Sequence, residues 1–170
     1  KTLKLTNPKA FVVENVRGLK TMWDGNVFKE IIKKFESAGY IVTESLLNSA
    51  DYGVPQIRHR VFIVGIKKEL NKKFEFPKPE FDKDDYITCG EAIGNLPSLE
   101  NGELKSNDYN EKPTTNYQRY VMDSNKIYNH EATLHKQFVK DTIALVPEGG
   151  NYKDLPKGVG DSRKFNEAWT

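Results

Sequence analysis

The sequence predicts an α/β fold in which helices cover a parallel sheet. Short apolar runs at residues 10–13, 40–47 and 60–66 are typical of strands, and a helical pattern separates the first run from the second. A strand, a helix and a strand in succession usually form a right-handed crossover. We therefore expect the first two strands to pair in parallel.

The first strand and the helix have the clearest patterns. Residues 10–13 read AFVV, a continuous apolar run that suits a strand buried on both faces of a parallel sheet. The helix begins at residue 26, where the apolar residues change to helical spacing, and Gly39 supplies a C-terminal stop. Its predicted apolar face comprises Val27, Phe28, Ile31, Ile32 and Phe35.

Beyond the third strand, two prolines within residues 74–81 end the predicted sheet. We expect a short helix around residues 91–96, and long loops or a binding segment across residues 106–126. A longer helix is predicted over residues 134–146, with Thr133 as its N-cap. Its predicted apolar face comprises Leu134, Phe138, Ile143 and either Leu145 or Val146.

The composition predicts one domain and part of another. Of the 170 residues, 37% are apolar and 29% are charged, which allows a core but is small for a two-domain enzyme. Because the chain begins with Lys1 rather than Met, we expect a fragment of a longer protein. The single cysteine, Cys89, excludes a disulfide framework and favours the cytoplasm. No apolar run approaches ~20 residues, so we expect no membrane span.

The net charge of +2 averages two unlike halves. Residues 1–79 hold 15 Lys and Arg against 8 Asp and Glu, whereas residues 80–170 hold 11 against 16. The basic half permits a polyanionic partner, although surface lysines mostly serve solubility.

Glu14 and Asn15 follow the first apolar strand and precede Gly18. Ligands collect at the carboxyl ends of parallel strands, which is where we expect both side chains. A carboxyl group that is partly removed from water can act there as a proton donor. The simpler alternative is that Glu14 caps the following turn or pairs with a lysine.

Gln56, Arg58 and Arg60 alternate along the chain, so in an extended segment their side chains share one face. Two guanidinium groups on one face suit carboxylates or phosphates, and the Gln56 amide suits the edge of a heterocycle. An ordinary salt-bridged edge strand is the alternative interpretation.

Three blocks of the sequence resemble, in the same order, the cytosine-C5 DNA methyltransferase family. They are PKAFVVENVRGL at residues 8–19, NSADYGVPQIRHRVFIVG at 48–65, and NHEATLHKQFVKDTIALVPEGGNYKDLP at 129–156. The resemblance implies that residues 1–97 are the C-terminal half of a Rossmann-like, S-adenosylmethionine-dependent methyltransferase sheet. Residues 98–170 would be part of a small, irregular target recognition domain.

The resemblance also implies an activity. Such enzymes transfer a methyl group from S-adenosylmethionine to C5 of a flipped cytosine in double-stranded DNA, here in a bacterial restriction-modification system. By resemblance, Glu14 assists at N3 of the cytosine and Arg60 contacts O2, while Asn15, Gln56 and Arg58 position the loop or nearby phosphates.

The family's nucleophilic Pro-Cys-Gln loop and glycine-rich cofactor loop have no counterpart in this chain. We therefore expect the chain alone to bind S-adenosylmethionine poorly and to be inactive. Cys89 is interpreted as structural and Trp23 as a packing anchor.

Two alternatives remain open at this stage. One is a family member that methylates transfer RNA, and the other is a noncatalytic DNA-binding paralogue. A metal site is not expected, because His130 and His135 are five residues apart and do not share a helix face.

Overall fold

The computed structural model of the chain describes residues 2–100, 108–109 and 111–159. It divides into two compact units, of which the first comprises Lys1–Gly94 and Thr114–Val121 and the second comprises Asn95–Pro113 and Met122–Thr170. The functional division predicted at residue 97 stays a prediction, and part of the predicted recognition domain lies outside the described residues.

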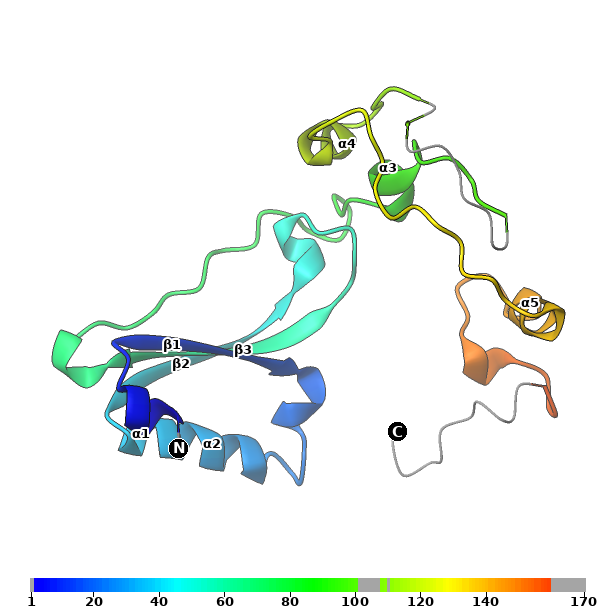
Figure 1. The fold of residues 1–170 in the computed structure, drawn as a ribbon. Helices are drawn as coiled ribbons and strands as arrows, with labels where there is room; N and C mark the ends of the chain where they lie inside the picture. The colour runs from blue at the N-terminus through cyan, green and yellow to red at the C-terminus, as the bar shows by residue number, and fades with distance from the viewer. Residues whose placement is uncertain (1, 101–107, 110, 160–170) are drawn as a thin grey trace. The chain divides into compact units, whose positions relative to one another are not determined.

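The first unit is built around a three-stranded sheet in the order β1-β3-β2 (Figure 1). The strands are β1 (Ala10–Val16), β2 (Tyr40–Asn48) and β3 (His59–Lys67). A short helix, α1 (Thr2–Thr6), precedes β1, and the longer α2 (Asn26–Ser37) connects β1 to β2. The α/β class and the three predicted strands are confirmed.

The expected parallel pairing of the first two strands is wrong. β3 is antiparallel to both β1 and β2 and lies between them, so β1 and β2 run in the same direction without pairing. The reason is the short connection after β2, which contains the 3₁₀ turn η2 (Ser49–Tyr52) and reverses the chain. A short reversal returns β3 beside β2, whereas a parallel neighbour would need a long crossover.

The core of this unit lies between α2 and one face of the sheet. Val61 and Ile63 of β3 are fully buried and pack with Leu19 and Phe28, each 8% exposed. The other predicted apolar residues of α2 pack against this cluster and are partly buried. Burial of one such side chain stabilises the fold by roughly 1.5–3 kcal/mol. The apolar face of α2 therefore determines that the helix packs against this side of the sheet.

Glycines end α2 and allow the close approach of an aromatic ring. Gly39 has a φ of 92°, which confirms the predicted stop after the helix. Gly65 of β3 lies against the Phe11 ring, where a Cβ atom would overlap the ring carbons. Phe11 therefore seats over β3 only because residue 65 has no side chain.

After the sheet, the chain folds back against the β2–β3 connection. Tyr52 Oη donates to the Pro77 carbonyl at 3.0 Å, and the Phe81 N–H donates to the Asp51 carbonyl at 3.1 Å. The short helix α3 (Cys89–Ile93) follows, two residues earlier than predicted. It begins there because Thr88 and Glu91 form a reciprocal capping box.

Residues 106–126, predicted as loops or a binding segment, contain the helix α4 (Asn116–Val121). The Gln118 side chain explains this local order. It is 2% exposed, and its Oε1 accepts from the Thr114 N–H at 2.8 Å. The remaining short 3₁₀ turns are η1 (Arg17–Lys20), η3 (Lys68–Leu70) and η4 (Tyr152–Asp154).

In the second unit, α5 (Gln137–Ala144) is shorter than predicted, and its buried side is not the predicted apolar face. Lys136, not Thr133, is its N-cap, and Val139 is its buried residue at 6% exposed. The predicted apolar residues are largely exposed, including Leu134 at 79% and Phe138 at 62%. Periodicity identified the helix, but packing within the unit selected the side that is buried. Within the described ranges, no helix is long and apolar enough to cross a bilayer.

Candidate functional site

Glu14 and Arg60 meet on the face of the sheet that α2 does not cover. In the register of β1 and β3, Glu14 is opposite Phe62 and Val16 is opposite Arg60, so the two charged residues are diagonal neighbours on one face. Arg60 Nε donates to Glu14 Oε1 at 2.9 Å, and the Arg60 side chain is 20% exposed. The hypothesis that both contact one ring requires this shared face.

Glu14 lies within β1 rather than after it, because the strand continues to Val16. Alternation along the strand places Val12, Glu14 and Val16 on the same face. Val12 is 66% exposed and Val16 is 52% exposed. An exposed carboxylate thus lies between two exposed apolar side chains on an edge strand of the described sheet.

Arg60 is held at two points. Its Nε contacts Glu14, and its Nη1 donates to the His59 carbonyl at 2.8 Å. Because guanidinium is planar, two bonds from different nitrogens define the orientation of the whole group. Because Arg60 lies in β3, its orientation is supported by a strand rather than by a loop.

Gln56 and Arg58 do not extend the face of β3. Both are exposed and lie in the connection before the strand, which begins at His59. The alternation argument therefore applies to Arg60 alone. The backbone of Arg58 is nonetheless fixed, since its N–H donates to Asn48 Oδ1 at 3.0 Å and its carbonyl accepts from the Ser49 N–H at 3.0 Å.

Asn15 follows Glu14 directly, so its side chain leaves β1 on the opposite face. It is exposed, and its Oδ1 accepts from the Val16 N–H at 2.8 Å. Of the five predicted site residues, the structure brings Glu14 and Arg60 into contact. Within the described part of the chain, the hydrogen bonds of Asn15, Gln56 and Arg58 do not reach that pair.

The C-5 cytosine-specific DNA methylase family matches residues 1–166 of the chain. The chain belongs to this family. The resemblance carried by the three sequence blocks is thereby confirmed.

Relatives of the chain include several Type II methyltransferases. The chain is 36% identical over 169 residues to M1.HphI of Haemophilus parahaemolyticus, covering 97% of this chain and 39% of that protein. It is 37% identical over 160 residues to M.DdeI of Desulfomicrobium norvegicum, covering 90% and 39%. It is 51% identical over 83 residues to M.FnuDI of Fusobacterium nucleatum, covering 48% and 24%. The chain thus spans about two fifths of the length of the first two.

Two residues outside the catalytic hypothesis are more exposed than predicted. Trp23 is 77% exposed, so the prediction that it anchors packing is wrong. It lies in a turn where Trp23, Asp24 and Gly25 have left-handed φ values of 46°, 54° and 76°. Cys89 is exposed rather than packed, and its Sγ lies 3.8 Å from the Pro55 carbonyl.

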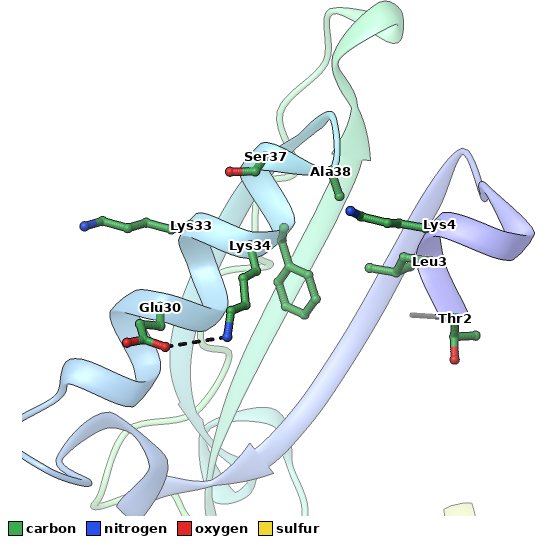
Figure 2. Close-up of a pocket in the computed structure, with 9 residues that line it drawn as sticks. Thr2, Leu3, Lys4, Glu30, Lys33, Lys34, Ser37 and Ala38 are labelled. Atoms are coloured by element: carbon green, nitrogen blue, oxygen red, sulfur yellow. Dashed lines mark ion pairs between the residues drawn. The ribbon is translucent and has the colours of Figure 1, made fainter.

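A cavity of about 730 Å³ lies between α1 and α2, apart from the predicted site residues (Figure 2). Lys4, Lys33 and Lys34 line it, and its one carboxylate, Glu30, pairs with Lys34 at 3.5 Å. Whether this chain holds the family's cofactor stays a prediction.

The residues that sequence reasoning missed are Asn48, Asp51 and Tyr86, which form a hydrogen-bonded cluster behind the β2–β3 connection. The hydrogen bond to Asp51, followed by desolvation, raises the pKa of Tyr86 above its ordinary value. Asn48 at the end of a strand and Asp51 three residues later were a visible turn signal. Tyr86 gave none, since it lies 35 residues beyond Asp51. Among the residues that the structure describes, no group of three His, Cys, Asp or Glu residues could hold a metal.

Proposed function

We propose that this chain is the central part of a DNA (cytosine-5)-methyltransferase of a bacterial restriction-modification system. Family membership and the Type II relatives support the activity. The share of those relatives that the chain spans supports its being one part of a longer polypeptide. The proposed substrate is double-stranded DNA, and the proposed location is the cytoplasm.

The contact between Glu14 and Arg60 is the observation that carries the proposal. Cytosine N3 and O2 are adjacent positions on one edge of the ring, so the groups that recognise them must themselves be neighbours. A carboxyl and a guanidinium 2.9 Å apart satisfy this requirement. Glu14 would hold a proton at N3, while an Arg60 N–H would donate to O2.

These two contacts explain how the residues would accelerate the reaction. Cytosine C5 is a poor nucleophile until a thiolate adds at C6, and that addition moves negative charge onto N3 and O2. A proton donor at N3 and a cation at O2 stabilise the charge as it develops. S-adenosylmethionine supplies the methyl group in this family. The target base must leave the duplex to reach the pair.

We propose that the attacking thiolate and the cofactor site are supplied by polypeptide outside this chain. The one cysteine, Cys89, lies in α3 and outside any Pro-Cys-Gln sequence. The exposed Val12 and Val16 beside Glu14 also favour a covering segment, because apolar side chains on an edge strand are usually covered.

Methylation assays on the longest reading frame that carries this chain test the proposal. We expect transfer of labelled methyl groups from S-adenosylmethionine to duplex DNA, and no transfer by the 170-residue chain alone. Transfer to transfer RNA alone would favour the RNA-modifying alternative. Tight DNA binding without transfer, together with a missing Pro-Cys-Gln codon set upstream, would favour the noncatalytic paralogue.

A further inference from the structure

Three side chains of the first unit, at the β2–β3 connection, are all hydrogen-bonded to one another. Asn48 Nδ2 donates to Asp51 Oδ1 at 3.0 Å and to Tyr86 Oη at 3.1 Å. The Tyr86 hydroxyl in turn donates to Asp51 Oδ1. Asp51 also accepts through its backbone carbonyl from the Glu80 and Phe81 N–H groups, at 2.9 and 3.1 Å. The segment after the sheet is thus tied to the connection before β3.

This network determines which way the Asn48 amide points. Asn48 is 7% exposed, so an incorrectly turned amide would leave buried polar atoms without partners. The Asp51 carboxylate can only accept, and therefore requires the amide nitrogen on its side. The amide oxygen is left facing the Arg58 N–H, from which it accepts at 3.0 Å.

The orientation of the Asn48 amide controls the backbone at Arg58. Asn48 Oδ1 holds the Arg58 N–H, and the Ser49 N–H holds the Arg58 carbonyl at 3.0 Å. Arg58 is therefore fixed on both sides of its Cα, two residues before Arg60. The last register pair of β2 and β3 joins Asn48 to His59, so the same asparagine marks where β3 begins.

We propose that Tyr86 and Asp51 are positioning residues, which act through Asn48 to fix the Arg58 backbone and the entry of Arg60 into the site. The inference rests on the proposed function, because it assigns these contacts to cytosine methylation. Neither residue needs to touch the substrate. A displacement of about 1 Å at a positioned group costs up to about 100-fold in rate, so loss of one hydroxyl in the network has a measurable effect.

The chain offers a matched pair of tyrosines for the test. Tyr86→Phe removes the hydroxyl from the network, whereas Tyr52→Phe removes one that donates to the Pro77 carbonyl at 3.0 Å. Both hydroxyls join the β2–β3 connection to the segment after the sheet, but only that of Tyr86 contacts Asn48. In the full-length enzyme, we expect Tyr86→Phe to lower kcat by about 10-fold with KM for DNA changed less than about threefold, and Tyr52→Phe to leave kcat within about twofold.

Hydrogen exchange supplies a readout that does not depend on activity. In the full-length protein, the Arg58 amide should exchange faster in Tyr86→Phe than in Tyr52→Phe or in the wild type, since its acceptor is no longer held in place. If Tyr86→Phe does not fold, Asp51→Asn replaces it. An amide at residue 51 no longer dictates the orientation of Asn48, and the same changes in kcat and exchange are expected.

The possible outcomes separate this inference from the proposed function. A wild type that transfers no methyl group to DNA rejects the proposed function, and the positioning role with it. A wild type that is active, with the two tyrosine variants equal in kcat and in Arg58 exchange, rejects the positioning role alone. Faster Arg58 exchange with unchanged kcat also rejects it, because the fixed backbone would then be irrelevant to turnover.

Discussion

At the scale of single residues, the pair of Glu14 and Arg60 links sequence to proposed chemistry. Each is unremarkable alone, since exposed glutamates and arginines commonly form surface ion pairs worth less than about 1 kcal/mol. What distinguishes this pair is its position on an open sheet face, beside exposed valines and away from the core. Substitution should therefore affect turnover far more than folding.

For Glu14→Gln in the full-length enzyme, we expect the methyl-transfer rate to fall by about 100-fold or more, because glutamine cannot supply a proton at N3. DNA affinity should change by less than about threefold. Single-turnover methylation and a DNA-binding titration measure the two quantities. Glu44→Gln is the matched control, since Glu44 of β2 also forms an exposed ion pair, with Lys20 at 2.7 Å. Equal rates for the two variants would remove Glu14 from the mechanism.

For Arg60→Lys, we expect a loss of turnover of about 10-fold or more despite retention of the positive charge. An ammonium group cannot contact Glu14, the His59 carbonyl and a base through one rigid plane. Steady-state kinetics with duplex DNA measure the loss, and thermal unfolding shows whether the fold is intact. Full activity would mean that only the charge at residue 60 matters.

At the scale of elements, two local devices hold the parts that flank the site. The capping box of Thr88 and Glu91 begins α3, and hydrogen bonds from the backbone and then the side chain of Thr88 lower the pKa of Glu91. The close contact of Gly65 with Phe11 joins β3 to β1, the two strands that carry the candidate pair. Each device gives a distinct prediction.

The lowered pKa of Glu91 determines how its contribution to stability changes with pH. A carboxyl whose pKa is lower in the folded state stabilises the fold above its ordinary value of 4.5 and loses that contribution as the pH falls through the lowered value. We expect the difference in Tm between the wild type and Glu91→Gln to be largest near neutral pH and to shrink as the pH falls towards 3. Thermal denaturation from pH 7 to pH 3 checks this, and a constant difference would contradict it.

Gly65→Ala tests the contact between β3 and β1. The added methyl group overlaps the Phe11 ring, so we expect a loss of about 1–3 kcal/mol in the free energy of unfolding. Urea denaturation of the full-length protein measures it. Gly18→Ala is the matched control, because a Cβ at Gly18 meets nothing within 4 Å. Similar losses for both variants would place the effect in glycine flexibility rather than packing.

At the scale of the whole molecule, the described sheet has an outer strand with exposed apolar side chains on one face. β1 is the outer strand of the order β1-β3-β2, and Val12 and Val16 project from it with 66% and 52% of their surfaces exposed. An open edge with apolar side chains invites pairing with another chain. When the 170-residue chain is produced alone, we expect this outer strand to be accessible to solvent.

We therefore expect the 170-residue chain to self-associate, and Val12→Lys to reduce the association by placing a charge on the edge strand. Sedimentation velocity across a range of protein concentrations measures it. Val54→Lys is the control, since Val54 is 43% exposed but lies outside the sheet. Equal association of the two variants would show that β1 is not the contact.

The sequence by itself determined the features that depend on neighbours along the chain. The spacing of apolar residues and glycines predicted the three strands, the helix after residue 25 and the turn at Gly39. The sequence blocks around Glu14 and Arg60 indicated the family. Tertiary structure decided the rest: the place of β3 between β1 and β2, the buried side of α5, and the link from Tyr86 to Asn48. These are contacts between residues far apart in sequence or choices between faces of one element. Their energies come from packing and hydrogen bonding that no local pattern records.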